Sequence, residues 1–378
     1  MDCSGEGESE CLSAAPSDFC TDDGFDYGRI TCSATCTLDE THCGRYGEGR
    51  FSWATEFSLD NLRFLEPSTP RQAYALWPLN ATTIVVAAEK GIWSVDSTKG
   101  VQGDREKGSH GGPSPDPYVS LGRTNAGDIL GSGEGCKIRY RDVDNMGEGD
   151  WKDIGGTLDP CTPEEDEFRL RRSNDGSPMY TFAENRIWRL DGNSWIEEVA
   201  TDLTKINDAW ANSEGPVVFV GDGGKAVYRC PQDGATWATT EAPETANLYS
   251  VWGAGDTFYA AGEGRLWRLA LGCSPSGTPQ WTDICADSQQ KCEGLDRNLQ
   301  MLWGSAPDNV FAVGSNLTLL HYDGSSWAPM NPPSDLPTSR SPPEYITMVP
   351  LAANRLLFLI QVGDTDIPYN YSLRLLQY

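Results

Sequence analysis

The histidines are the side chains best suited to acid–base chemistry, and this chain has only three of them, His42, His110 and His321. His321 falls within a predicted strand, where a packed or surface role is favoured over catalysis. No glycine-rich phosphate loop, nucleophile elbow or zinc-binding helix motif occurs elsewhere. The sequence therefore predicts a non-enzymatic protein. The alternative is a glycan hydrolase or lyase that uses carboxylates gathered on one face of the fold.

Carboxylates are abundant, with 55 acidic residues against 29 basic ones and a formal net charge of -26. Nucleic acid and anionic membranes are excluded as partners, because both require clustered Lys and Arg. The run at 164–167 and the pair Asp364 and Asp366 offer oxygen ligands, but they lack the ordered spacing of a calcium loop. We predict no metal and no cofactor, with structural calcium as the alternative.

One pattern of short strands repeats seven times between Ala73 and Tyr378, with a period of roughly 40 to 50 residues. The typical copy has a strand with an aromatic or apolar end, an apolar strand closing on Ala or Gly, an alternating strand, and then Trp. A single unit of this kind cannot bury its apolar face alone. The pattern predicts an all-β fold, a seven-bladed β-propeller of four-stranded blades over residues 45–378.

Two copies depart from the pattern. Blade 1 lacks the Trp that opens the fourth strand, so this strand is predicted to be degenerate or looped out. Blade 7 ends at Tyr378 after three strands. Residues 51–57, FSWATEF, match the fourth-strand pattern and precede blade 1, so we expect them to pair with the last strand and close the ring.

The first 44 residues form a different unit, with little apolar content and half of the chain's twelve cysteines. A segment this short cannot build a sufficient core, so we predict a disulfide knot over residues 1–44. Zinc binding is one alternative, since His42 adjoins Cys43, and lipidation of Cys3 is another. The cysteines of the predicted knot are Cys3, Cys11, Cys20, Cys32, Cys36 and Cys43.

The other six cysteines can be assigned to faces of the propeller by strand polarity. The connections between blades and those from second to third strands share one face, which we call the top, and the remaining connections share the bottom. This places Cys136 with Cys161 and Cys285 with Cys292 on the top, and Cys230 with Cys273 on the bottom. Complete pairing indicates an oxidising compartment: extracellular, cell-surface or periplasmic. Apolar runs are strand-sized, so no membrane span is predicted.

Two stretches resemble known repeats. The phrases at 302–314 and 319–327, LWGSAPDNVFAVG and LLHYDGSSW, resemble the repeat arrays of secreted proteins from myxobacteria and related predatory or gliding bacteria. The run FCTDDGFDYGRITCSATCTLDETHCG resembles the cysteine-rich repeat of myxobacterial surface proteins. The resemblance implies a propeller in a secreted or surface-displayed protein, and almost no chemistry.

Long irregular connections on the top face are the predicted binding surface, because extra chain that packs no core costs ordering entropy. Those of blades 6 and 7 are joined by candidate binding residues in the last blade, Tyr345, Tyr369, Tyr371, Asp364 and Asp366. The repeated Trp residues, such as Trp252 and Trp303, are expected to pack between blades. We predict a protein or glycan partner, such as another subunit of an envelope or extracellular assembly.

Overall fold

The computed structural model describes residues 27, 31–32 and 38–39 and, with gaps, 43–378. The larger segments outside the description are 1–26, 63–71, 97–103, 106–117, 124–128, 134–136, 142–150, 159–167, 173–178, 232–235, 274–276, 285–297, 338–341 and 364–369.

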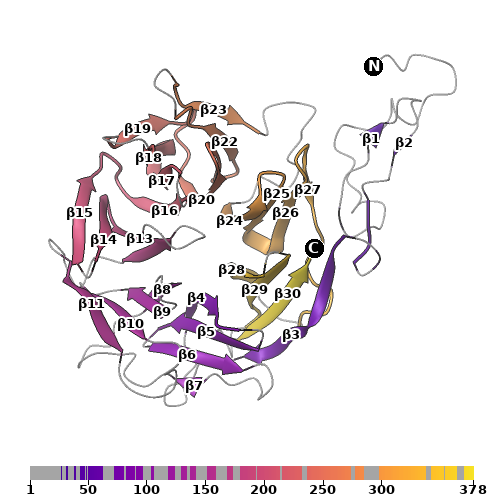
Figure 1. Cartoon of the computed structure of the whole chain (residues 1–378). Helices are drawn as coiled ribbons and strands as arrows, with labels where there is room; N and C mark the ends of the chain where they lie inside the picture. The colour runs from indigo at the N-terminus through magenta and orange to yellow at the C-terminus, as the bar shows by residue number, and fades with distance from the viewer. Residues whose placement is uncertain are drawn as a thin grey trace, which may run out of the picture.

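Seven antiparallel four-stranded units stand around one axis, as Figure 1 shows. Blades 1 to 3 comprise β4 (Ala73–Pro78), β5 (Thr83–Ala88), β6 (Gly91–Asp96) and β7 (Asp104–Arg105); β8 (Tyr118–Arg123), β9 (Ile129–Gly133), β10 (Lys137–Arg141) and β11 (Lys152–Thr157); and β12 (Arg169–Arg172), β13 (Met179–Ala183), β14 (Arg186–Asp191) and β15 (Ser194–Ala200). Blades 4 and 5 comprise β16 (Ile206–Ala211), β17 (Val217–Gly221), β18 (Lys225–Arg229) and β19 (Ala238–Glu241); and β20 (Leu248–Ala254), β21 (Thr257–Gly262), β22 (Leu266–Ala270) and β23 (Gln280–Asp283). Blades 6 and 7 comprise β24 (Leu299–Ala306), β25 (Asn309–Gly314), β26 (Thr318–Tyr322) and β27 (Trp327–Pro329); and β28 (Glu344–Ala352), β29 (Arg355–Gln361), β30 (Tyr371–Gln377) and β3 (Ser52–Leu62). The predicted seven-bladed propeller is confirmed.

The second strands are deeply buried. All five residues of β17 and all six of β25 are buried. Such strands read as continuous apolar runs because both faces of each blade are covered, one by the preceding blade and one by the next. The core is therefore divided into apolar layers between blades, as in the cluster that joins blades 7 and 1 through Leu359, Leu373 and Val86.

The ring is closed by the strand from the amino-terminal side. β3 pairs antiparallel with β30, and Ser52 lies opposite Gln377. The strand is longer than the predicted 51–57. Its far end is fixed by Arg374, whose side chain is 1% exposed and binds Asp60 (2.8 Å) and Asp335 (3.1 Å). A buried guanidinium needs such paired carboxylates, so this cluster ties β3 to β30 and to the connection between blades 6 and 7.

The outer strands of blades 1 to 3 depart from the regular pattern. β7 has only two residues, which confirms the degenerate fourth strand predicted for blade 1. β11 and β15 are joined by one parallel bridge between Gly155 and Ser194, so blades 2 and 3 form a single eight-stranded sheet. The Trp195 indole supports this junction by donating a hydrogen bond to the Ile154 carbonyl (3.0 Å). The sequence pattern did not predict the junction.

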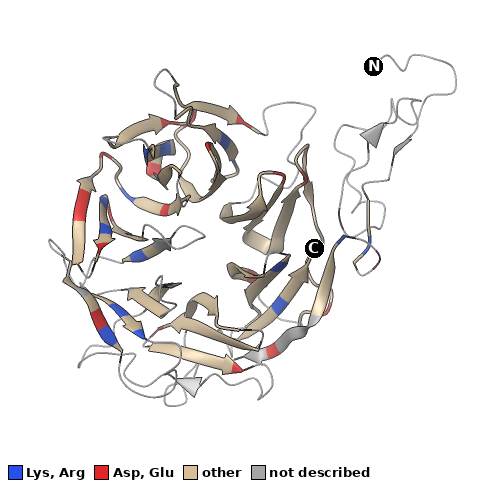
Figure 2. Cartoon of the chain, viewed as in Figure 1, with Lys and Arg blue, Asp and Glu red and all other residues tan. Residues whose placement is uncertain are grey.

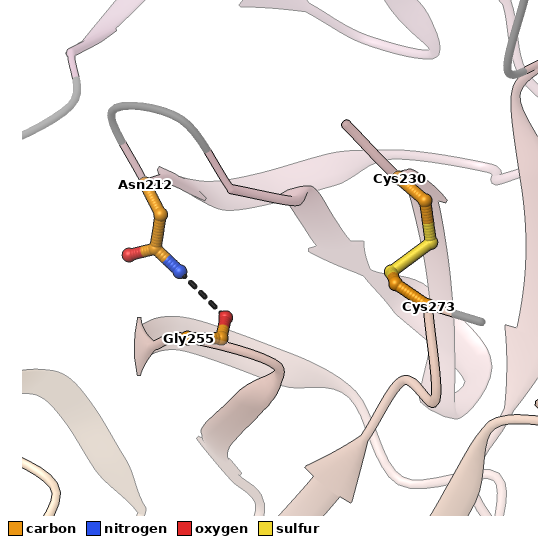
Figure 3. Close-up of a disulfide and its surroundings, with 4 residues drawn as sticks. All are labelled: Asn212, Cys230, Gly255 and Cys273. Carbon is orange, nitrogen blue, oxygen red and sulfur yellow. Dashed lines mark hydrogen bonds between the residues drawn. A yellow bond between two sulfur atoms is a disulfide. The ribbon is translucent and has the colours of Figure 1, made fainter. Parts of the chain in front are cut away.

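The disulfide between Cys230 and Cys273 is present and joins the ends of β18 and β22, as predicted (Figure 3). Beside it, the Asn212 amide donates a hydrogen bond to the Gly255 carbonyl (2.8 Å), so blades 4 and 5 are linked twice on this side. Cys43 is also disulfide-bonded, and no cysteine among the described residues is free. The pairs Cys136–Cys161 and Cys285–Cys292 lie outside the described residues and stay predictions.

Part of the cysteine-rich segment contacts the propeller. Tyr27 forms β-bridges with Gly44 and with Met330, and its ring packs edge-on against Phe51 (4.6 Å between centroids). Cys32 lies in β1 (Thr31–Cys32), which pairs with β2 (Leu38–Asp39). The remaining knot cysteines and His42 lie outside the described residues, so the disulfide-knot and zinc readings of residues 1–44 stay predictions.

Candidate partner-binding face

Two predicted binding residues are in the core. Tyr345 is 2% exposed and packs against Phe358 (5.4 Å between ring centroids). Tyr371 is fully buried, and its hydroxyl accepts a hydrogen bond from the Ala73 main-chain nitrogen (2.8 Å). The prediction that these two tyrosines form an exposed aromatic surface is wrong, because blades 6 and 1 cover both faces of blade 7. Tyr369, Asp364 and Asp366 lie outside the described residues.

The repeated tryptophans fill the spaces between blades, as expected. Trp252 and Trp303 are buried. The Trp252 indole lies between Trp210 of blade 4 (6.1 Å between ring centroids) and Gly304 of blade 6. A side chain at Gly304 would collide with this indole at 2.8 Å, so glycine allows the close approach. These two indoles contribute to packing and are not positioned as a stacking surface for sugars.

The exposed face near the axis is built by one repeated feature of the first strands. In six blades the pairing of the first and second strands skips one residue near the start of the first strand, a β-bulge. Arg169, after Phe168, takes the corresponding place in blade 3. We call these seven residues the axial ring: Tyr74, Val119, Arg169, Asn207, Tyr249, Gln300 and Ile346.

The axial ring divides into two contiguous halves. Ile346, Tyr74 and Val119, from blades 7, 1 and 2, are half-buried and are apolar or aromatic. Blades 3 to 6 contribute four polar or hydrogen-bonding side chains, of which Arg169 and Gln300 are exposed. All seven lie near the starts of first strands, so they belong to the top face. This face therefore presents an apolar sector beside a polar one.

Hydrogen bonds fix the polar half across three blades. Arg169 donates to the Asn207 carbonyl (3.1 Å), which links blade 3 to blade 4. The Asn207 amide donates to Asp222 Oδ1 and to the Leu248 carbonyl, both at 2.9 Å, and so reaches blade 5. A second link runs from the Gly223 main-chain nitrogen to Asn247 Oδ1 (3.0 Å). Arg169 and Asn207 are thus held in place before any binding protein arrives.

Glu263 completes this network in blade 5. Its carboxylate accepts hydrogen bonds from the Asn247 main-chain nitrogen, the Asn247 amide and the Tyr249 hydroxyl, each at 3.1 Å. The main-chain bond and the Tyr249 hydroxyl lower the pKa of Glu263, so the exposed carboxylate is ionised at neutral pH. Burial and the Glu263 charge raise the pKa of Tyr249, which keeps its hydroxyl as a donor.

Nearby cations are paired with carboxylates. Lys225 contacts Asp202 (3.5 Å) and Glu241 (3.4 Å), and Arg265 contacts Glu244 (2.8 Å). In Figure 2, the Lys and Arg residues of the described strands are scattered over several blades. The polar side chains of this face are therefore engaged in hydrogen bonds and ion pairs with one another.

His321 does not belong to this face. It is buried in β26, where its Nε2 donates to Asn309 Oδ1 (2.7 Å) and its ring packs against Phe51 and Phe311. Of the packed or surface role predicted for this histidine, the structure shows the packed one. Within the described part of the chain, no group of three His, Cys, Asp or Glu residues is placed to hold a metal ion. The same part contains no helix with the length and hydropathy of a membrane span.

The axial ring and its network were missed at the sequence level. Asn207 and Asn247 interrupt apolar strand starts, INDAW and NLYSVW, and an alignment of the seven copies on Ile206 and Leu248 would have placed Asn207 and Tyr249 at one position. The hydrogen bonds to Asp222 and Glu263 join the start of each first strand to the connection after the second strand of the same blade, and no local pattern signals them.

No protein-family model matches the chain, and no curated protein matches it. Solved structures do. A structure described as YCF48 bound to D1 peptide is similar with a TM-score of 0.55 and 14% sequence identity, covering 88% of this chain and 96% of that one. YCF48 from Cyanidioschyzon merolae gives a TM-score of 0.56 and 10% identity, covering 87% and 98%. At these identities the likeness shows the fold.

Proposed function

We propose that the protein is a non-enzymatic binding propeller that recognises a protein partner through the top face, centred on the axial ring. The observation that carries this proposal is the hydrogen-bond network that fixes Arg169, Asn207 and Tyr249 across blades 3 to 5. Side chains held before binding lose little entropy when a partner arrives. Tyr, Asn and Arg are also residue types suited to adaptable protein interfaces.

The partner should be a segment with two kinds of side chain. Ile346, Tyr74 and Val119 offer apolar contact. The polar half of the axial ring offers hydrogen-bond donors and acceptors, and the neighbouring Glu263 adds an ionised carboxylate. The similar structure described as YCF48 bound to D1 peptide supports a peptide or protein partner. Glycan cleavage is less well supported, because hydrogen bonds from neighbouring side chains already engage Asp222 and Glu263.

We further propose that the protein works outside the cytoplasm, in the medium, at the cell surface or in the periplasm, as part of an envelope or extracellular assembly. Twelve cysteines, of which Cys230 and Cys273 are bridged and Cys43 is also oxidised, support an oxidising compartment. The resemblance of two stretches to repeats of secreted myxobacterial proteins points the same way. Cell fractionation with an antibody against the propeller tests the location, and recovery in the cytoplasm would contradict it.

A photo-crosslinking amino acid at Tyr249 or Ile346 tests the binding face. The matched control is the same substitution at Ile196, an exposed residue on the outer strand of blade 3. We expect one protein to be captured from both axial positions and not from Ile196. Its affinity for purified R169A should then fall at least tenfold, and its affinity for I196A should not change. Capture from Ile196 alone, or equal affinities, would overturn the proposal.

A further inference from the structure

The chain is attached to blade 6 by a small cluster that comes just before β3. We call it the clasp: Tyr27, Tyr46, Arg50 and Phe51. Tyr46 donates a hydrogen bond to the Asn331 carbonyl (2.6 Å), and the Tyr27 hydroxyl accepts one from the Arg50 main-chain nitrogen (3.0 Å). The clasp therefore links the cysteine-rich segment, the closing strand and blade 6.

His321 lies directly beneath the clasp. The Phe51 ring meets the imidazole edge-on, with 4.9 Å between centroids, and the Arg50 guanidinium lies 5.2 Å from the centre of the Phe51 ring. Asn309 Oδ1 accepts hydrogen bonds from both Arg50 Nη2 (2.9 Å) and His321 Nε2 (2.7 Å). One acceptor thus serves two donors, one from the clasp and one from blade 6.

Burial and the nearby Arg50 cation favour a neutral imidazole. Asn309 Nδ2 donates to Ser305 Oγ (2.6 Å), which orients Oδ1 toward His321, so Nε2 carries the proton and Nδ1 is the basic site. A second proton would place a cation in a largely aromatic site beside Arg50.

We propose that His321 makes the clasp acid-sensitive, so that protonation of the imidazole releases Arg50 and Phe51 from blade 6. Release exposes the imidazole to water, where the charge is solvated. The segment that leaves is the one leading into β3, so the first pairs of the closing strand, Ser52 with Gln377 and Trp53 with Leu376, loosen with it.

The charged and titratable groups around His321 set the direction of the response. Burial, followed by the charge of Arg50, lowers the pKa of His321 to about 3, and Asp323, which directly follows β26, opposes this only in part. Asp323 is itself held by Ser325 and Ser326. Tyr378, which packs against Phe51 and Phe311, stays neutral because burial raises its pKa.

The sign of the effect follows from linkage. A histidine whose folded pKa is below the ordinary 6.5 binds fewer protons in the clasped state, so the clasp weakens as the pH falls below 6.5. Between pH 7.5 and pH 5 the released population should rise about 30-fold. This is the factor by which protonation of an exposed imidazole with a pKa of about 6.5 favours the released state over this pH range. This factor is nearly the same for any folded pKa below about 4.

Hydrogen–deuterium exchange of the full chain, corrected for intrinsic rates, tests the proposal at pH 7.5 and pH 5. We expect exchange at Ser52 to Ala54 to accelerate about 30-fold, and exchange in β17 and β18 of blade 4 to change less than threefold. H321Q keeps a nitrogen donor for Asn309 but does not titrate, so its exchange at Ser52 to Ala54 should be nearly independent of pH. Equal acceleration in both blades, or in H321Q, would overturn the proposal.

A second measurement does not depend on how H321Q folds. In the wild-type protein, the proton NMR signal of the His321 ring should not titrate between pH 7.5 and pH 5 in the clasped state. R50Q should shift its pKa upward while leaving the ring buried. A His321 signal that titrates near pH 6.5 in the clasped wild type would contradict the proposal.

Discussion

Arg229 and Cys230 are consecutive residues at the end of β18, and they connect blade 4 to opposite neighbours. Arg229 binds Glu198 of blade 3, donates to the Tyr180 hydroxyl and lies over the Trp237 ring at 4.7 Å. Cys230 forms the disulfide with Cys273 of blade 5. Two adjacent side chains thus fix three blades on the bottom face, one by charge and one by a covalent bond.

Removing the disulfide should destabilise the propeller as a whole. The bridge closes a loop of 43 residues, for which the chain-entropy estimate is about 4 kcal/mol, and measured effects are typically about 2 to 4 kcal/mol. We expect C230S/C273S to lose this much free energy of unfolding in denaturant titrations. N212A, which removes only the neighbouring hydrogen bond to Gly255, is the matched control and should lose about 1 kcal/mol. Equal losses would contradict the prediction.

The ion pairs of Glu198 should give a pH-dependent contribution to stability. Burial raises the pKa of this carboxyl, but hydrogen bonding to Arg189 and the charges of Arg229 and Arg189 outweigh burial, so the pKa lies below its usual 4.5. The stabilisation is therefore present above pH 4.5 and is lost as the pH falls through the lowered value. The gap in Tm between wild type and E198Q should narrow from pH 6 to pH 3.5. A constant gap would show that charge plays no part.

Ser250 should be more important than the equivalent serine of blade 2. Ser250 Oγ donates to the buried Asp208 carboxylate of blade 4 (2.8 Å) and accepts from the Leu302 nitrogen of blade 6 (3.0 Å). Within the described residues, Ser120 exchanges hydrogen bonds with the Leu170 main chain of blade 3, which carries no charge. Because S250A leaves a buried carboxylate and an N–H short of partners, we expect a loss of about 2 to 3 kcal/mol.

The control S120A should lose about 1 kcal/mol, since it removes bonds between neutral groups only. Chemical denaturation of both variants under the same conditions measures the difference. If S120A were the more destabilising of the two, the carboxylate of Asp208 would not be the reason for the importance of Ser250.

Truncations should separate the closing strand from the cysteine-rich segment. Removal of residues 1–62 deletes β3, exposes the edge of β30 and leaves the buried Arg374 without Asp60, so we expect loss of cooperative thermal unfolding. Removal of residues 1–26 keeps Tyr27 and should preserve the cooperative transition. Similar melting curves for the two truncations would show that β3 does not close the ring.

The repeat pattern predicted most of the fold because each blade carries its own local signal. Strand polarity was enough to pair Cys230 with Cys273, and the match of 51–57 to the fourth-strand pattern was enough to find β3. The exposed surface was harder to predict. Alternation of polar and apolar side chains identifies an exposed face only when one face of a sheet contacts solvent. Both faces of blade 7 are covered, and every residue of β30 from Tyr371 to Leu376 is buried. Tyr345 and Tyr371 were therefore assigned to the wrong environment.

Contacts between distant residues were not predictable from one sequence. Arg50 and Asn309 are 259 residues apart, and nothing in the sequence around either residue indicates that Asn309 Oδ1 bonds to both Arg50 and His321. The packed role of His321 followed from its place in a strand, but its covering by Phe51 did not. The bond of Asn207 to Asp222 spans only 15 residues, but it depends on how the connection after β17 folds back over the start of β16.

The pairing of β3 with β30 sets an order of events during synthesis. Asp60 leaves the ribosome 314 residues before Arg374. During this time β3 cannot pair with β30, because the intervening blades are synthesised first. A contact this distant in sequence forms slowly. Chaperones that hold extended chains would therefore meet β3 without its partner strand, and blade 7 would assemble only after β30 had emerged.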